Sequence, residues 1–347
     1  MTPRVHLAVF PMSPLQIQRD WTRSPGFARR VLDPEFLAQI AAIAESGVVD
    51  QLFIPDKNTV NGTSDEDLTT LGNAWFEPVT LMSYLAARTR HIGLVATAST
   101  RWFEPFQVAR MFASLDHLSG GRGGWNAVSS HPGLEDHNYG HLPAVEGDAS
   151  SRRHREFVEV VLRLWDSWDA DAIVADVAEP RWARPGSVRR IGHHGEFFQV
   201  EGPLNVARSP QGRPVVVQAG ESERFRERAA ATADVVFTRF LGVEQGAAFT
   251  TDLRERTERA GRGPDSVRVL PSAVVTLGRG DSGDPVMATH WHFRGSAVGF
   301  TVLPTLLPDD LTEFVGAVVP ELQRAGAVPP GYSGTTLREN LALPPVG

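Results

Sequence analysis

Residues 92–130, IGLVATASTRWFEPFQVARMFASLDHLSGGRGGWNAVSS, decide the fold. Two apolar runs, residues 92–98 and 125–128, flank a segment at 105–118 whose apolar side chains recur every three or four positions. That spacing is typical of a helix with one face on a core. The glycines at 120, 121, 123 and 124 end this helix and lead into the second run. The order strand–helix–strand predicts two parallel strands with the helix packed across them.

The same alternation continues along the whole chain. Strands are predicted at residues 6–10, 49–55, 92–98, 125–128, 215–218, 235–238, 267–277 and 298–303. Helices are predicted at 33–47, 77–87, 105–118, 151–168, 223–233, 245–261, 285–294 and 311–325, with a hairpin at 194–201. This alternation, without a break in composition, favours a single (β/α)8 barrel domain over residues 1–347. A doubly wound open sheet is the alternative.

Composition narrows the class of protein. The 347 residues carry a formal charge of −7, which disfavours a nucleic-acid partner or an anionic membrane surface. The chain has no cysteine, so disulfides, thiolate metal sites and thiol nucleophiles are excluded. The first residues lack the apolar core of a signal peptide, and no long apolar run is present. We therefore expect a cytoplasmic protein without a membrane span.

Two sequence motifs match only part of the pattern of a known binding site. Residues 278–283 satisfy G-x-G-x-x-G, but the acidic residue expected about 20 positions on is replaced by the apolar Leu303. The histidine pairs at 193–194 and 290–292 lack a carboxylate at helical ligand spacing. We therefore expect neither a nicotinamide site nor a metal site.

Polar residues follow several predicted strands, where a parallel barrel places its chemistry. Asp56 follows the second strand, and Thr97 and Asn126 lie near the ends of the third and fourth. From barrel geometry alone, three uses of Asp56 are equally expected: capping the next helix, structural pairing, or hydrogen bonding to a ligand in the barrel mouth. Gly220, Glu221 and Ser222 join a strand to a helix N-terminus, which favours an anion site. A plain helix cap at Ser222 is compatible with it.

The run at 97–130 resembles the signature of bacterial-luciferase-like flavin monooxygenases. It is most similar to the subgroup that contains nitrilotriacetate monooxygenase, dibenzothiophene sulfone monooxygenase and pristinamycin synthase. GEFFQVEGPLNVARSPQGRPVVVQAGESE (195–223) and PELQRAGAVPPGYSGTTLREN (320–340) resemble the same subgroup. The resemblance implies a (β/α)8 barrel that uses reduced FMN from a separate NAD(P)H:flavin reductase, together with O2, to oxygenate a small molecule. It also implies a homo-oligomer, either a dimer or a tetramer.

The resemblance assigns roles to individual residues. It places Asp56, Thr97 and Asn126 near the flavin ring or ribityl chain. It places Gly220, Glu221, Ser222 and Ser151 at the FMN phosphate. Asn126 and Asp56 are the expected catalytic residues, and His131, on the loop after the fourth strand, is a further acid–base candidate.

The chain also departs from the family pattern. Phe225 replaces a glycine, and Ser150 and Ser151 replace Arg-Tyr. Arg152, Arg153 and Arg224 are candidate charge donors in their place, and because arginine charge alone is screened by salt more than a fixed set of hydrogen bonds, FMN binding is predicted to be weak and salt-sensitive. These departures leave open a degenerate, non-catalytic flavin-binding barrel. A related barrel enzyme that uses F420 for hydride transfer is the other alternative.

The family's long insertion over the barrel mouth is shortened between residues 277 and 287. This predicts a bulky substrate, such as a natural-product intermediate, in a mouth lined by four aromatic side chains: Trp21, Trp75, Trp102 and Phe103.

Overall fold

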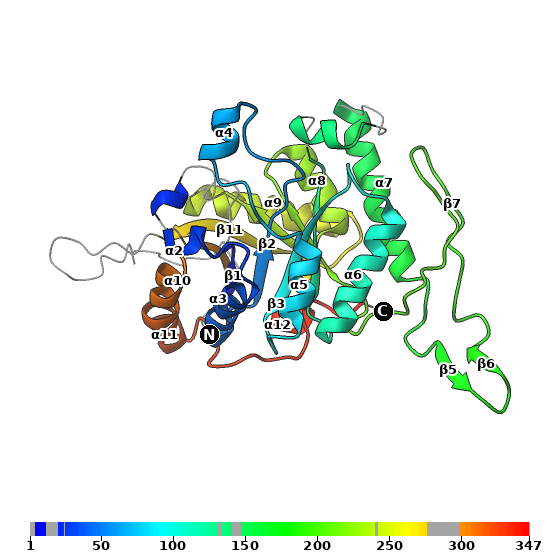
Figure 1. Ribbon diagram of the computed structural model, residues 1–347. Helices are drawn as coiled ribbons and strands as arrows, with labels where there is room; N and C mark the ends of the chain where they lie inside the picture. Colours follow the sequence, from blue (N-terminus) through cyan, green and yellow to red (C-terminus); the bar gives the residue numbers. More distant parts are fainter. Residues whose placement is uncertain are drawn as a thin grey trace.

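The computed structural model describes residues 4–11, 20–23, 25–130, 133–140, 147–239, 242–275, 299–304 and 306–346. Within them, parallel strands close into an eight-stranded barrel in which β1 pairs with both β2 and β12 (Figure 1). The barrel strands are β1 (His6–Val9), β2 (Gln51–Ile54), β3 (Gly93–Ser99), β4 (Gly123–Val128), β9 (Val215–Ala219), β10 (Val235–Thr238), β11 (Arg268–Val275) and β12 (Gly299–Pro304). The (β/α)8 prediction is confirmed, and the open doubly wound sheet is wrong because the barrel has no free edge.

Residues 92–130 fold as predicted. β3 and β4 pair in parallel, and helix α6 (Pro105–Ser119) connects them and ends at Gly120 in a left-handed conformation (φ 67°). Trp125 of β4 is fully buried, and its indole Nε1 donates to the carbonyl of Ala98 over 3.0 Å. This tryptophan packs against Phe112 of α6, so the helix and both strands share one core.

Helices surround the barrel strands on the outside, except for the last one, α12, which lies at the N-terminal end of the barrel. They are α2 (Pro25–Ala28), α3 (Pro34–Ser46), α4 (Asp65–Thr70), α5 (Pro78–Ala86), α6, α7 (Gly147–Trp165), α8 (Glu223–Thr232), α9 (Val243–Arg259), α10 (Asp309–Glu313), α11 (Val319–Arg324) and α12 (Leu337–Asn340). The predicted helix at 285–294, the G-x-G-x-x-G run and the shortened insertion lie outside the described residues. No helix among the described residues is long and apolar enough to cross a membrane.

The predicted final helix is continuous but changes pitch. Between α10 and α11 the chain forms a π-helical segment, Phe314–Val318, and the amide of Val319 bonds to the carbonyl of Phe314. Pro320 has no amide hydrogen and its ring clashes with a carbonyl one turn earlier, so the preceding turn widens. The proline thus explains a feature that hydrophobic periodicity alone does not predict.

Two hairpins leave the barrel after α7. β7 (His193–His194) and β8 (Gln199–Val200) confirm the predicted hairpin. A second hairpin, β5 (Ile173–Asp176) with β6 (Arg181–Ala183), was not predicted and projects away from the barrel (Figure 1). It exposes four large apolar side chains: Ile173, Val174, Val177 and Trp182.

The C-terminal tail plugs the N-terminal end of the barrel. Leu337 of α12 packs with the barrel lining, together with Leu341 and Leu343. Gly93, at the start of β3, makes room for it, since a Cβ there would lie 2.3 Å from Leu337 Cδ1. The apolar plug leaves the opposite end, where the strands finish, as the accessible mouth.

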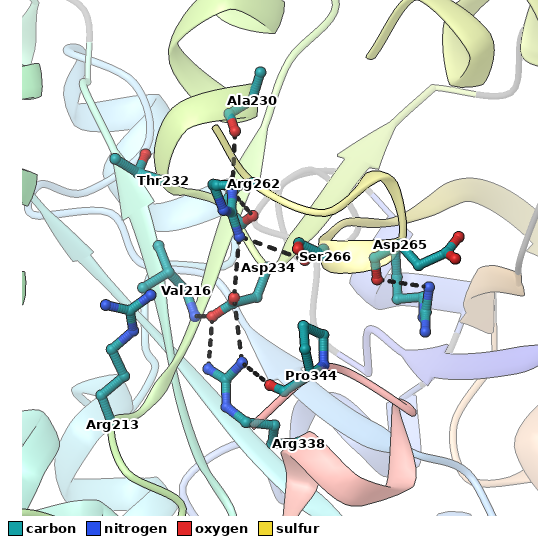
Figure 2. Close-up of polar contacts among 12 residues, drawn as sticks. Arg213, Val216, Ala230, Thr232, Asp234, Arg262, Asp265, Ser266, Arg338 and Pro344 are labelled. Atoms are coloured by element: carbon teal, nitrogen blue, oxygen red, sulfur yellow. Dashed lines mark hydrogen bonds and ion pairs between the residues drawn. The ribbon is translucent and has the colours of Figure 1, made fainter. Parts of the chain in front are cut away.

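A buried carboxylate fixes this plug (Figure 2). Asp234 Oδ2, just before β10, accepts hydrogen bonds from Arg338 Nη2 at 2.9 Å and from the amide of Val216 at 3.0 Å. Arg262 Nη2 lies 3.4 Å from Oδ1. Burial works to raise the pKa of Asp234, and the guanidinium of Arg338 outweighs it, so the pKa is lowered. The carboxylate is therefore ionised and paired in the folded protein.

We expect Asp234→Asn to destabilise the protein by about 3–5 kcal/mol, because it leaves two buried arginines without their counter-charge. Urea unfolding followed by circular dichroism measures the change. Arg254→Ala, which removes an exposed ion pair with Asp265, is the control and is expected to change stability by less than about 1 kcal/mol. A loss no larger than that of the control would show that the tail is held by apolar packing alone.

Candidate functional site

Thr97 and Asn126 lie side by side inside the mouth. They are register partners on β3 and β4, and both are buried. Thr97 Oγ1 donates to the carbonyl of Ile54 over 2.8 Å, so its oxygen must accept from Asn126 Nδ2, 3.0 Å away. Asn126 Oδ1 is then buried without a partner among the described residues. The site thus offers a fixed, unsatisfied acceptor to a ligand N–H or O–H group.

Asp56 follows β2 at the same rim. Its Oδ1 accepts from the amide of Lys57 at 2.9 Å, and its Oδ2 from Asn58 Nδ2 at 3.2 Å. It caps no helix and has no cationic partner among the described residues, because Lys57 Nζ bonds instead to Asn61 Oδ1. The helix cap is therefore wrong, the two hydrogen bonds hold the carboxylate within its own loop, and the ligand contact stays a prediction.

The environment of Asp56 makes it a weak acid at neutral pH. Burial raises the pKa of Asp56 to about 6, and the nearby carboxylates of Glu77 and Glu135 add to the effect. A carboxyl group with this pKa exchanges a proton close to physiological pH.

The loop after β4 covers part of the mouth. Glu135 Oε1 accepts from the amide of Asn58 at 2.6 Å, and Asn138 Nδ2 donates to the Asn58 carbonyl over 2.8 Å. Tyr139 donates its hydroxyl to Asn58 Oδ1 over 2.8 Å, and its ring stacks on Trp102 with centroids 5.0 Å apart. The loop therefore closes over the Asp56 side of the rim.

The aromatic side chains predicted to line the mouth differ in their burial. Trp75 and Phe103 are partly buried and pack against the main core, and Trp102 is buried with its ring stacked on that of Tyr139. An aromatic lining of the mouth stays a prediction. Trp21 is exposed and donates its Nε1 to the carbonyl of Thr70 over 2.9 Å. His131 lies outside the described residues, and its acid–base role stays a prediction.

The turn between β9 and α8 has the shape of a helix-end anion site. Ser222 Oγ accepts from the amide of Phe225 at 3.2 Å and caps α8, so the predicted cap is confirmed. Gly220 has a φ of 156°, and a Cβ there would lie 2.7 Å from the Phe225 ring. Glu221 turns to Arg239, with 2.6 Å between Oε2 and Nη2, and the bond lowers the pKa of Glu221. Arg239 therefore neutralises the Glu221 carboxylate, which leaves the backbone amides at the start of α8 favourable for an anion.

The first turns of α7 and α8 meet beside this turn, joined by an ion pair between Asp148 and Arg224. Ser151 lies one turn further along α7. Of the other arginines proposed as charge donors, Arg152 pairs with Glu196 at 2.8 Å, and Arg153 donates to the carbonyl of Thr100. All three arginines are therefore already engaged by the protein.

Two further residues near this turn are not predicted from the sequence. His154 of α7 is buried, with its Nδ1 2.9 Å from Thr100 Oγ1 and its Nε2 unpartnered. Arg228 of α8 has no acidic partner in the part of the chain that the structure describes, and its Nε makes no hydrogen bond. His154 precedes Phe157 by three positions, and Arg228 follows Phe225 by three. Helical periodicity therefore places both on inward faces and could have drawn attention to them.

The barrel, its plugged N-terminal end and its polar C-terminal rim define a barrel enzyme with a small-molecule site in the mouth. The sequence model of the luciferase-like monooxygenases matches residues 15–290, and the chain belongs to this family of oxidoreductases.

Three known proteins show how far the likeness extends. Nitrilotriacetate monooxygenase component A from Aminobacter aminovorans is 32% identical over 420 positions, which cover 93% of each chain. The structure of EDTA monooxygenase EmoA from Chelativorans sp. BNC1 is 29% identical, with a TM-score of 0.83, over 99% of this chain and 100% of that one. Riboflavin lyase RcaE, solved with modified FMN and riboflavin, is 25% identical, with a TM-score of 0.85, over 97% and 95%. The alignment of 420 positions exceeds the 347 residues of this chain, so the first relative has segments that this chain lacks.

We expect Asp56→Asn to stabilise the protein at pH 8 by up to about 2–3 kcal/mol, with the gain disappearing near pH 4. The pKa of Asp56 in the folded state, about 6, is above the value of about 3.9 in an unfolded chain. Ionisation therefore opposes folding, and the stability that the protonated group contributes is lost as the pH rises through about 6. Thermal unfolding at several pH values measures this, with the exposed Asp309→Asn as control. An equal gain at pH 4 and pH 8 would contradict the raised pKa.

Proposed function

We propose that this protein is the oxygenase component of a two-component monooxygenase that uses reduced FMN and O2. The observation that carries the proposal is the buried, unpartnered Asn126 Oδ1 at the mouth of a luciferase-like barrel. When bound, reduced FMN would supply the two electrons for a reaction with O2 in which one oxygen atom enters the substrate and the other leaves as water.

The residues at the rim fit a flavin. A flavin carries N–H groups on its ring and hydroxyl groups on its ribityl chain, both of which donate to an amide oxygen such as Asn126 Oδ1. Thr97 holds that amide in one orientation. The capped N-terminus of α8, with Gly220, Glu221 and Ser222, suits the phosphate at the other end, and Ser151 lies on the adjacent helix.

The chain's own contribution to catalysis is positioning, proton exchange and exclusion of water. Asn126 orients the ring by accepting a hydrogen bond. Asp56 holds or releases a proton at its carboxyl oxygen, since its pKa is raised to about 6. The loop anchored on Asn58 and Trp102 covers the mouth and limits the access of water. His131, at the start of this loop, is a second proposed acid–base group.

The proposed partner is a separate NAD(P)H:flavin reductase. The relative from Aminobacter aminovorans is named as component A, which supports a division of labour between chains. We also propose a cytoplasmic homo-oligomer, a dimer or tetramer, and the exposed apolar β5–β6 hairpin supports self-association. Hydride transfer from F420 and a non-catalytic barrel have less support, because the relatives named above with 32% and 29% identity are monooxygenases.

The proposed substrate is a bulky organic molecule of the natural-product type. A chain without some of its relatives' segments has less protein with which to cover the mouth, and a large substrate fills that space itself. Activity that rises with substrate size across a graded panel is the expected result. Activity confined to molecules of a few carbon atoms would contradict it.

The test of the proposed function is O2 consumption with FMN, NADH, a flavin reductase and a panel of candidate substrates. Substrate-dependent O2 uptake with a mono-oxygenated product by mass spectrometry is the expected result. Substrate reduction without O2, or tight NADPH binding by the isolated chain, would contradict the proposal.

We expect Asn126→Ala to lower the rate of substrate oxidation at least about tenfold while the fold is retained, because the variant loses a ligand hydrogen bond and little core packing. Gln51→Ala is a matched control: it removes another buried, unpartnered amide, at the N-terminal end of β2. We expect that control to keep the parent rate. If Asn126→Ala oxidises at the parent rate and melts early, the residue is structural.

A further inference from the structure

Arg228 is a partly buried cation without an anion, and its Nε is a buried atom without a hydrogen-bond partner. None of its guanidinium nitrogens has a carboxylate partner among the described residues, whereas Arg224 and Arg226 on the same helix each have one. Burial lowers the pKa of Arg228, as expected for a charge removed from water without compensation. A protein keeps such a group at a cost in stability, which is recovered when an anion binds.

The position of Arg228 brings its charge to the N-terminus of α8. Helical side chains lean toward the N-terminus, and the Arg228 guanidinium lies 5.8 Å from the centroid of the Phe225 ring, one turn earlier. Gly220 lies against the same ring, since a Cβ there would be 2.7 Å away. The Phe225 ring is therefore a neighbour of both the Arg228 guanidinium and the Gly220 turn.

His154 completes this arrangement from α7. It lies close enough to Arg228 that burial and the arginine's charge both lower the pKa of His154, so the imidazole is neutral. Its Nδ1 lies 2.9 Å from Thr100 Oγ1. The Thr100 hydroxyl has two acceptors in reach, Nδ1 of His154 and the carbonyl of Val128, which is 3.2 Å away. An anion beside Nε2, which has no partner in the described protein, favours donation to Nδ1, because Nε2 then carries the hydrogen and donates to the anion.

We propose that Arg228 and His154, with the N-terminus of α8, form a binding site for a phosphate monoester, filled by the phosphate of FMN. This rests on the proposed function for the identity of the ligand, but not for the presence of the anion site. The proposal also gives a role to Phe225, which stands where the family has a glycine: its ring lies next to the Arg228 guanidinium. Because Arg228 is partly buried, salt should weaken FMN binding less than the sequence alone predicts.

The experiment titrates the full-length protein with FMN and with riboflavin, which lacks only the phosphate, and follows flavin fluorescence. The variants are Arg228→Met and the matched control Arg224→Met, which removes an exposed arginine from the same helix. For the parent we expect FMN to bind at least about tenfold more tightly than riboflavin. Arg228→Met should weaken FMN about 10- to 100-fold and leave riboflavin unchanged, as expected for the loss of a charge-assisted hydrogen bond. Arg224→Met should change neither.

Thermal unfolding without ligand separates a binding role from a structural one. Arg228→Met removes an uncompensated buried charge, so it should melt at a higher temperature than the parent. Inorganic phosphate should raise the melting temperature of the parent but not of this variant. If Arg228→Met does not fold, Arg228→Lys keeps the charge without the planar fork, and it should bind FMN with intermediate affinity.

Several results would overturn the inference. Equal affinity of the parent for FMN and riboflavin would show that the proposed phosphate site does not exist, while the proposed flavin-dependent function would stand. An Arg228→Met variant that melts lower and loses both flavins would show a structural role. If neither flavin binds while phosphate still stabilises the parent through Arg228, the proposed function fails and the anion site stands.

Discussion

The ion pair between Asp234 and Arg338 is the interaction on which the rest of the structure depends. It joins the start of β10 to the C-terminal tail, 104 residues away, in a place from which water is excluded. The tail in turn carries Leu337 into the end of the barrel, against Gly93. With that end filled by apolar side chains, a ligand site is expected at the carboxyl ends of the strands, where the polar residues of the described barrel lie. A single open end is what makes a water-restricted site feasible.

Barrel closure then decides which residues meet. Parallel strands in a closed sheet all finish at one rim, so Asp56, Asn126 and the Gly220 turn share the mouth although they are far apart in sequence. The register between β3 and β4 sets Thr97 directly beside Asn126. Hydrogen bonding then settles the orientation of the amide, because the Thr97 hydroxyl has only one hydrogen, and it goes to Ile54. The unsatisfied acceptor is therefore a consequence of strand pairing.

The sequence predicts the periodic parts of this arrangement well. The helix at 105–118 and the strand-end positions of Thr97 and Asn126 follow from spacing alone. The tail helix does not, since Leu337–Asn340 is too short to show a period and its stabilising partner is distant in the chain. Nor does the pKa of Asp56, which depends on burial and on carboxylates from other segments. The sequence also does not reveal which arginines lack an acidic partner, because a pair such as Arg152 with Glu196 forms only in the tertiary structure.

The two ends of the barrel use charge in opposite ways. At the plugged end, buried arginines surround a carboxylate, and the charges are compensated within the chain. At the mouth, Arg228, His154 and Asn126 keep donors and acceptors that the described protein does not satisfy. Each such group destabilises the fold until a ligand supplies its partner. Ligand binding at the mouth is therefore expected to recover the free energy of folding that these unpartnered groups cost. The paired charges at the plugged end carry no such cost, because each has its counter-charge within the chain.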